Sequence, residues 1–220
     1  MWYDVVDRLD PALHRAHLMD FRGCGLSDRP VDGHDLDGYC ADLRAVLDAA
    51  GPCTLVGHSM GGKVAQALAA ENHPAIQRLV LVAPGSARAV GLNAAHRAHA
   101  EEAFGSRERI ERFQRGAMMR PLAPAAMERI VEDALVAQRE HWFGWYDRGR
   151  LADFADRLER ITVPAVVVGG ENDILAPPSR LKRDVVGRIA GALFVNLRSA
   201  GHNLPVETPD EVAGVIARFV

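Results

Sequence analysis

Apolar residues along the chain follow two patterns, one at helical spacing and one in short continuous runs. Helical spacing predicts amphipathic helices over residues 2–9, 36–50 and 63–71. Apolar runs between them predict strands at residues 14–21, 53–56 and 79–82. The run at 79–82 contains no polar residue, as is typical of a parallel strand covered on both faces. The alternation of helix and strand predicts an α/β fold with a mostly parallel sheet, helices on both faces and right-handed crossovers.

The pattern changes after the third of these strands, because residues from about 93 to 160 contain helical spacing but no convincing strand. A helix is expected around Ile110, with Ser106 as its cap, and a stronger one over residues 127–135. A further helical stripe covers residues 151–158. We therefore expect this stretch to be a helical insertion.

The sheet pattern returns after the insertion. Apolar runs at residues 164–168 and 192–197 predict two more strands, with a helix around residues 181–189 between them. The last helix begins at Thr208-Pro209-Asp210-Glu211, which has the spacing of a capping box. The expected division is a core of residues 1–86 and 161–220 and an inserted helical domain of residues 87–160.

A serine between two glycines lies at the step from the strand at 53–56 to the helix that follows. The run Gly57-His58-Ser59-Met60-Gly61 fits the nucleophile-elbow pattern G-x-S-x-G, in which a sharp turn lifts the serine hydroxyl clear of the sheet. Gly57 and Gly61 are expected to leave room where strand and helix approach. The N–H groups at the start of the helix favour an oxyanion. Ser59 is therefore the candidate nucleophile, with a chance Gly/Ser turn as the alternative.

A serine hydroxyl needs a base to activate it, and the base needs an acid to orient it. Functional groups in parallel sheets gather just past the carboxyl ends of strands. His202 follows the last predicted strand and Asp173 follows the one before it, which gives the chain order Ser, Asp, His. Glu171 and Asp184 are competing acids, and with nine histidines in the chain a loop histidine can also occur by chance.

Composition narrows the classes of function. The 220 residues are 48% hydrophobic with a net charge of −3, which suits one core and offers no basic field for nucleic acid or an anionic membrane. Cys40 and Cys53 lie in apolar patterns and are expected as buried thiols rather than bridges. No apolar run approaches the ~18 residues of a membrane span, and the first residues lack signal-peptide features. We expect a cytoplasmic protein without a metal or organic cofactor, and the oligomeric state stays open.

Four motifs carry a resemblance that covers the chain from Trp2 to Val220. They are the runs at residues 57–62, 20–27, 170–173 and 201–202. Together they resemble the esterase- and lipase-like members of the α/β-hydrolase superfamily, although Cys24 stands where relatives usually carry histidine, phenylalanine or tyrosine.

The resemblance implies acyl transfer to water. Ser59 would attack the carbonyl carbon of a small-molecule acyl substrate, and His202 would take and return the proton. Asp173 would orient His202, and the Met60 N–H would donate to the oxyanion.

The insertion would form a lid over the acyl pocket. Trp142 and Trp145 lie in it and, with His58 beside the nucleophile, are candidates for lining that pocket. Large aromatic residues in a small lid also serve simply as packing, which is the alternative for the two tryptophans.

The chain departs from the family pattern at its front. Relatives carry further strands before the equivalent of Trp2, followed by a His-Gly loop that supplies the second oxyanion N–H. Here no His-Gly precedes residue 58. The missing strand belongs between the strands at 14–21 and 53–56, which would have to pair directly or leave buried N–H and C=O groups unpaired at about 1–3 kcal/mol each. We expect a truncated chain, with a short protein completed by a partner as the alternative.

The leading prediction is a serine hydrolase that cleaves a small or medium carboxylic ester, thioester or lactone through Ser59. Hydrolysis of carbon–carbon bonds and perhydrolase-type chemistry use the same triad. A non-catalytic binding protein on a hydrolase scaffold is the alternative from another class, because loss of one oxyanion donor costs about 10²–10³ in turnover.

Overall fold

A computed structural model describes residues 1–91 and 94–220; residues 92 and 93, within the predicted insertion, lie outside the described residues. Over the described ranges the strands form one four-stranded parallel sheet in the order β1-β2-β3-β4. The strands are β1 Cys53–His58, β2 Ile76–Val82, β3 Ala165–Gly170 and β4 Leu193–Leu197. Every residue of β3 is buried because the strand pairs on both sides and is covered on both faces. The strands predicted at residues 53–56, 79–82, 164–168 and 192–197 are thus confirmed.

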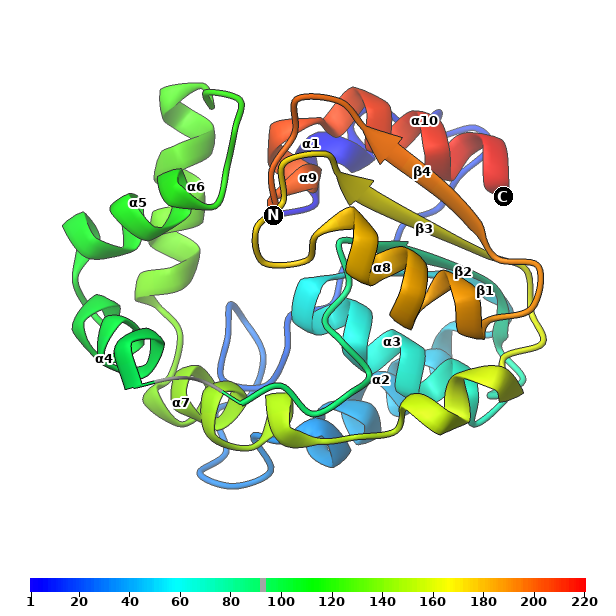
Figure 1. The fold of residues 1–220 in the computed structure, drawn as a ribbon, viewed down its shortest axis with the longest axis horizontal. Helices are drawn as coiled ribbons and strands as arrows, with labels where there is room; N and C mark the ends of the chain where they lie inside the picture. The colour runs from blue at the N-terminus through cyan, green and yellow to red at the C-terminus, as the bar shows by residue number, and fades with distance from the viewer. Residues whose placement is uncertain (92–93) are drawn as a thin grey trace.

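Helices cover both faces of the sheet, as Figure 1 shows. The helix α3, Ser59–Ala70, connects β1 to β2, and α8, Pro178–Asp184, leads from β3 toward β4. Right-handed crossovers between consecutive strands place both on one face, where α2, Leu36–Ala50, packs against α3. The other face carries α1, Tyr3–Val6, and α10, Pro209–Phe219, which contact each other. This confirms the predicted α/β class.

The helix α2 forms where the sequence predicts it. The side chain of Asp35 accepts a hydrogen bond from Gly38 N at 3.0 Å and so caps the first turn. Tyr39, Leu43 and Leu47 recur at helical spacing and are buried against the core. Cys40 on the same helix is a buried free thiol, and burial raises its pKa to about 12.

Residues 87–160 are called here the helical segment; in Figure 1 its α-helices lie beyond the carboxyl ends of the strands, and its last residues run back to the start of β3. Its helices are α4 Ala94–Ala103, α5 Arg107–Gly116, α6 Pro124–Leu135 and α7 Arg139–Asp147. Ser106 caps α5 by accepting from Arg109 N at 3.4 Å. The helix predicted at 151–158 is instead two 3-10 turns, Gly149–Leu151 and Ala155–Arg160. A short 3-10 turn, Val186–Arg188, likewise ends the helix predicted over 181–189.

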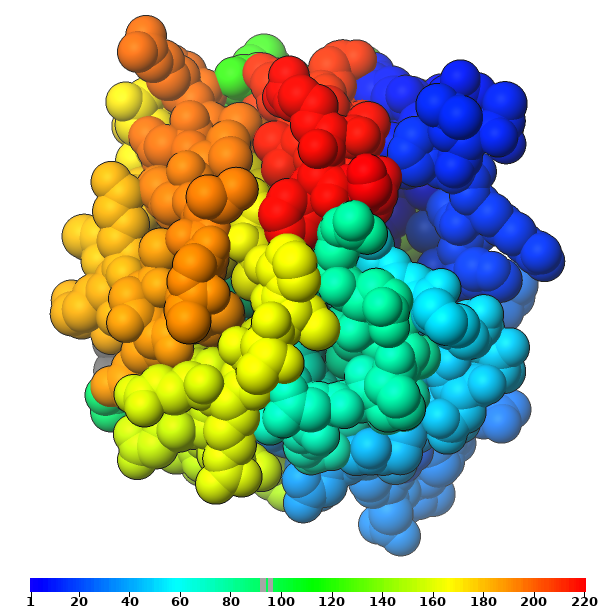
Figure 2. Space-filling model, turned by 90° about the vertical axis from the view of Figure 1, so that its right-hand side faces the viewer, coloured from blue at the N-terminus to red at the C-terminus, as the bar shows by residue number. Residues whose placement is uncertain are grey.

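The strand predicted at residues 14–21 does not form. β1 pairs only with β2 among the described strands, so this stretch has no neighbouring ladder to join. Of its apolar side chains, Leu18 is 48% exposed, whereas Met19 and Phe21 are partly buried against the core. Figure 2 shows this N-terminal part of the chain, in blue, beside the C-terminal helix in red. An apolar run predicts a strand only where a partner strand is available.

The capping box predicted at the start of α10 is also wrong. Thr208 donates its hydroxyl to the carbonyl of Leu204 at 3.0 Å instead of capping α10. The short helix α9, Leu204–Glu207, ends directly before Thr208 and supplies that acceptor. Glu211, the expected partner in the box, binds Arg120. The spacing fits a capping box, but the end of α9 offers Thr208 another acceptor and Arg120 binds Glu211.

No helix in residues 1–91 and 94–220 combines the length and the apolarity that a membrane crossing requires. Among the side chains that the structure describes, no group of three or more histidine, cysteine or acidic residues is arranged to hold a metal ion.

Candidate active site

Ser59 lies where β1 ends and α3 begins, in a strained backbone conformation. Its φ of 48° falls in the left-handed region, which side chains other than glycine rarely occupy. A Cβ on Gly57 would lie 2.6 Å from the carbonyl oxygen of Gly61, and one on Gly62 would lie 2.7 Å from Cβ of Pro84. A Cβ on Gly61 would make only ordinary contacts. The turn therefore requires glycine at 57 and 62 for space, whereas the sequence pattern had pointed to 57 and 61.

The side chain of His202 lies between Ser59 and Asp173. Its Nε2 is 2.9 Å from Ser59 Oγ, and its Nδ1 is 2.8 Å from Asp173 Oδ2. Both His202 and Asp173 are buried, with 7% and 3% of their surface exposed. Since a carboxylate accepts from Nδ1–H, the Nε2 of a neutral ring is left as the acceptor for the serine hydroxyl. Ser59 thus joins one hydrogen-bonded chain with His202, 143 positions away in sequence, and Asp173.

Asp173 is held in place and ionised by its surroundings. Its Oδ1 accepts from Leu175 N at 2.7 Å and from Ala176 N at 2.8 Å. Burial works to raise the pKa of this carboxyl, but the hydrogen bond and charge of His202 and the two backbone N–H groups outweigh it and hold the pKa below its ordinary value. The carboxylate is therefore charged at neutral pH and fixed toward the imidazole.

The competing acids take other partners. Glu171 accepts from Ser199 N at 2.9 Å, and Asp184 pairs with Arg183 at 2.8 Å. Neither binds His202. Among the three acids considered from the sequence, Asp173 is the one that contacts the histidine.

Met60 is the second residue of α3, at the end of the helix where the first N–H groups have no intrahelical acceptor. The carbonyl of Ser59 accepts from Gly85 N at 2.7 Å, which helps fix the turn. The Met60 N–H thus lies beside the nucleophile at the positive end of the helix dipole. Its role as oxyanion donor stays a prediction.

His58 contacts the base rather than the serine. Its Nε2 is 2.9 Å from the carbonyl oxygen of His202, and the two rings lie 5.1 Å apart. Burial, and then the nearby His202, lowers the pKa of His58 to about 3, so its ring is neutral and donates from Nε2 to that carbonyl. A role in substrate binding stays a prediction, and the contact with His202 was not evident from the sequence.

The two tryptophans pack inside the helical segment. Trp142 donates from Nε1 to the carbonyl of Ala100 at 3.0 Å, and its ring lies 5.9 Å from that of Phe104. The ring of Trp145 lies against Gly149, where an added Cβ would come within 2.5 Å of it. These contacts match the packing alternative, and substrate binding by either tryptophan stays a prediction.

The fold and this site together define the class of protein. A serine on a strained strand-to-helix turn, with an aspartate and a histidine on the loops after later parallel strands, is the arrangement of α/β-hydrolases. The family described as the alpha/beta hydrolase family matches residues 1–215, and the chain belongs to it.

Known relatives agree with this assignment. A non-heme chloroperoxidase from Streptomyces lividans is 24% identical over 226 residues, covering 94% of this chain and 82% of that protein. The structure of a bromoperoxidase from Bacillus anthracis superposes with a TM-score of 0.89 at 19% identity, over 99% of this chain and 86% of that one. The enol-lactonase from Burkholderia xenovorans LB400 gives a TM-score of 0.73 at 26% identity, over 91% and 78%. The chain is therefore an enzyme of the α/β-hydrolase type.

Proposed function

We propose that the protein is a serine hydrolase that cleaves a small or medium carboxylic ester, thioester or lactone. The observation that carries the proposal is the hydrogen-bonded chain from Ser59 through His202 to Asp173, with distances of 2.9 and 2.8 Å. A weak nucleophile, its base and the acid that orients the base are already in contact, which is the requirement for acyl transfer.

The first half of the reaction forms an acyl-enzyme. Ser59 Oγ attacks the carbonyl carbon of the substrate while His202 Nε2 takes its proton. The resulting oxyanion accepts a hydrogen bond from the Met60 N–H. When the tetrahedral intermediate collapses, His202 returns the proton to the departing alcohol, thiol or ring oxygen. Asp173 stabilises the imidazolium throughout because its carboxylate stays ionised.

The second half repeats these steps with water. His202 removes a proton from a water molecule, which attacks the acyl carbon and regenerates Ser59 as the carboxylic acid leaves. The α-helices of the helical segment lie beyond the strand ends that carry the triad, so we assign them the role of a lid over the acyl group. The resemblance to an enol-lactonase supports a lactone among the candidate substrates.

A second candidate is perhydrolase-type chemistry on the same acyl-enzyme. The relative named as a non-heme chloroperoxidase favours it. Hydrogen peroxide would replace water in the second half, so that the acyl group leaves as a peroxy acid. Measuring peroxy acid and carboxylic acid formed from one ester in the presence of hydrogen peroxide separates the two candidates.

A covalent trap tests the nucleophile directly. Incubation with a fluorophosphonate should add one phosphonyl group to the wild-type protein, seen as an increase in intact mass, while Ser59→Ala should remain unmodified. A peptide map should locate the group on Ser59. Well-folded wild-type protein that takes no adduct would contradict the proposal and favour a non-catalytic binding protein on this scaffold.

A further inference from the structure

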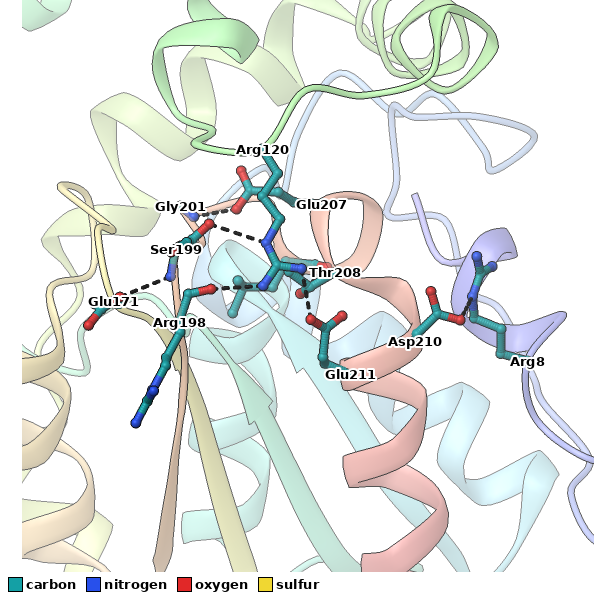
Figure 3. Close-up of polar contacts among 11 residues, drawn as sticks. Arg8, Arg120, Glu171, Arg198, Ser199, Gly201, Glu207, Thr208, Asp210 and Glu211 are labelled. Atoms are coloured by element: carbon teal, nitrogen blue, oxygen red, sulfur yellow. Dashed lines mark hydrogen bonds and ion pairs between the residues drawn. The ribbon is translucent and has the colours of Figure 1, made fainter.

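A buried carboxylate bridges the loop of His202 and the helical segment. Glu207, the last residue of α9, is only 6% exposed. One of its oxygens accepts from Met119 N at 2.6 Å, and the other accepts from Gly201 N. Gly201 directly precedes His202, and Met119 lies in the link between α5 and α6. The close-up in Figure 3 shows Glu207 beside Gly201.

The charge of Glu207 is met by backbone N–H groups. No lysine or arginine in residues 1–91 and 94–220 forms a salt bridge with it. A carboxylate has two acceptor oxygens, and here each one holds a different segment of the chain. The side chain therefore joins two backbones that are distant in sequence.

Direct backbone contact adds to this bridge. The N–H of His202 donates to the carbonyl of Ala117 at 2.7 Å. A Cβ on Gly201 would lie 2.6 Å from that same carbonyl oxygen and 2.9 Å from Cα of Met118. The link between α5 and α6 thus lies directly on the backbone that carries the histidine, and only glycine at 201 permits the approach.

Arg120 holds the beginning of the same loop. Its guanidinium donates to the carbonyls of Arg198 at 2.8 Å and Ser199 at 3.2 Å, and it pairs with Glu211 at 2.7 Å. Figure 3 shows the arginine reaching from the helical segment to all three. Arg120 and Glu207 therefore fasten the loop at both ends to one link of the helical segment.

We infer that Glu207 is a positioning residue that couples the α5–α6 link to His202. The inference rests on the proposed function, because it concerns the placement of the proposed base. The Nε2 of His202 lies 2.9 Å from Ser59 Oγ only while the backbone at 201–202 stays where Glu207 and Ala117 hold it. A displaced link loses these bonds together, so the proton acceptor is aligned when the helical segment is seated on the loop.

The variant Glu207→Gln tests the coupling with little change in shape. Its amide offers one acceptor oxygen, and its NH₂ faces an N–H, so only one of the two backbones is held. We expect the rate of fluorophosphonate labelling at Ser59 to fall between about tenfold and a hundredfold. With an ester substrate, kcat should fall while KM stays close to the wild-type value.

Asp210→Asn is the matched control. It removes the same charge three residues away, from an exposed side chain that pairs with Arg8 rather than with the loop. Its labelling rate should equal that of the wild type. Equal labelling rates for Glu207→Gln and Asp210→Asn would overturn the inference.

Hydrogen exchange gives a readout that does not depend on activity. In Glu207→Gln one of the two amides loses its acceptor directly, and coupling of the link to the loop should make the amides of Gly201 and Met119 both exchange faster. Faster exchange at Gly201 alone would contradict the coupling. If the wild type is never labelled and both amides still respond, the proposed function fails and the coupling stands.

Arg120→Ala provides a second variant if Glu207→Gln does not fold. The arginine side chain is 34% exposed, so its removal leaves the core intact. We expect faster exchange over residues 198–202 and slower labelling of Ser59. Unchanged exchange and labelling in Arg120→Ala would show that the link does not position the loop.

Discussion

Ser59 is held in a backbone conformation that costs on the order of 1–3 kcal/mol for a residue with a side chain. Two contacts oppose its relaxation, since its carbonyl accepts from Gly85 N and its hydroxyl contacts His202. Gly57 and Gly62 leave the space that the turn occupies. The backbone strain is thus located at the residue that the proposed chemistry uses, and the surrounding contacts maintain it.

His58 makes a prediction about acid stability. Its pKa of about 3 in the folded protein lies below the ordinary 6.5, because burial disfavours the charged ring. Between these values the unfolded chain binds a proton that the folded chain does not. The contribution of His58 to the free energy of unfolding should therefore have its full value above pH 6.5 and decrease as the pH falls toward 3.

The variant His58→Gln checks this dependence. Glutamine cannot be protonated in this range but keeps an N–H donor for the carbonyl of His202. Urea unfolding at several pH values should show that the free energy of unfolding decreases less steeply with falling pH in the variant than in the wild type. Some decrease should remain because His141, with its pKa lowered to about 4, acts in the same direction. Identical slopes for the two proteins would contradict the prediction.

At the scale of elements, an apolar pattern predicted the structure correctly where the folded chain supplies a strand or a core surface as its partner. The buried run of β2 has a strand on either side, and the amphipathic stripe of α2 packs on a face of the core. Residues 14–21 show the same kind of apolar run without a ladder to join, and they form no strand. Whether a partner exists is a property of the assembled sheet, which local spacing does not contain.

For the candidate site, too, the sequence predicted some residues and missed others. Loop positions after strands pointed to Asp173 and His202, and the parallel sheet brings both to Ser59. The contact of His58 with the His202 carbonyl and the bridge made by Glu207 were missed. A glutamate five residues after the histidine was the available signal for the bridge, but its second partner is 88 positions away in sequence.

Lys63 connects α3 to the chain that leaves the helical segment. Its Nζ donates to the carbonyls of Ala152 at 2.7 Å and Arg150 at 3.2 Å, and the residue is 1% exposed. Burial lowers its pKa from 10.5 to about 8. Between these values the unfolded chain binds the extra proton, so this group makes the free energy of unfolding rise with pH from about 8 to 10.5.

Comparison with Lys63→Met isolates this contribution. Tyr39 and Cys40, whose pKa values are raised by burial, act in the opposite direction and are common to both proteins. The stability of the wild type relative to the variant should therefore increase from pH 8 to pH 10.5. Urea unfolding across this range measures it, and a constant or decreasing difference would show that burial does not lower the pKa of Lys63.

On the scale of the whole molecule, the buried apolar residues of 1–91 and 94–220 form two clusters. The larger one joins residues from both ends of the chain, such as Val5 and Val212, to residues of the sheet such as Leu79. The smaller one lies in the helical segment, with Ile110, Met127 and Val131 buried at its centre. The helical segment thus buries little apolar surface in a cluster of its own, and polar interactions are needed as well to hold its helices together.

Exposed ion pairs supply part of that strength, which leads to a prediction about salt. Arg107 on α5 pairs with Glu128 and Glu132 on α6, and all three side chains are about half exposed. Such pairs contribute about 0.2–1 kcal/mol each and are screened at high ionic strength. Raising the salt concentration from about 0.05 M to about 1 M should accelerate amide exchange in α5 and α6 more than in β2 and β3.

Arg107→Gln serves as the matched variant for the salt experiment. Without its pairs, α5 and α6 should already exchange faster at low salt, and added salt should then have a smaller effect on them. Exchange in β2 and β3 should match the wild type under both conditions, because those strands lie in the larger apolar cluster. An equal response of the strands and the helical segment to salt would mean that the molecule opens as one unit. In that case the α5–α6 link could not move relative to His202 without unfolding the sheet.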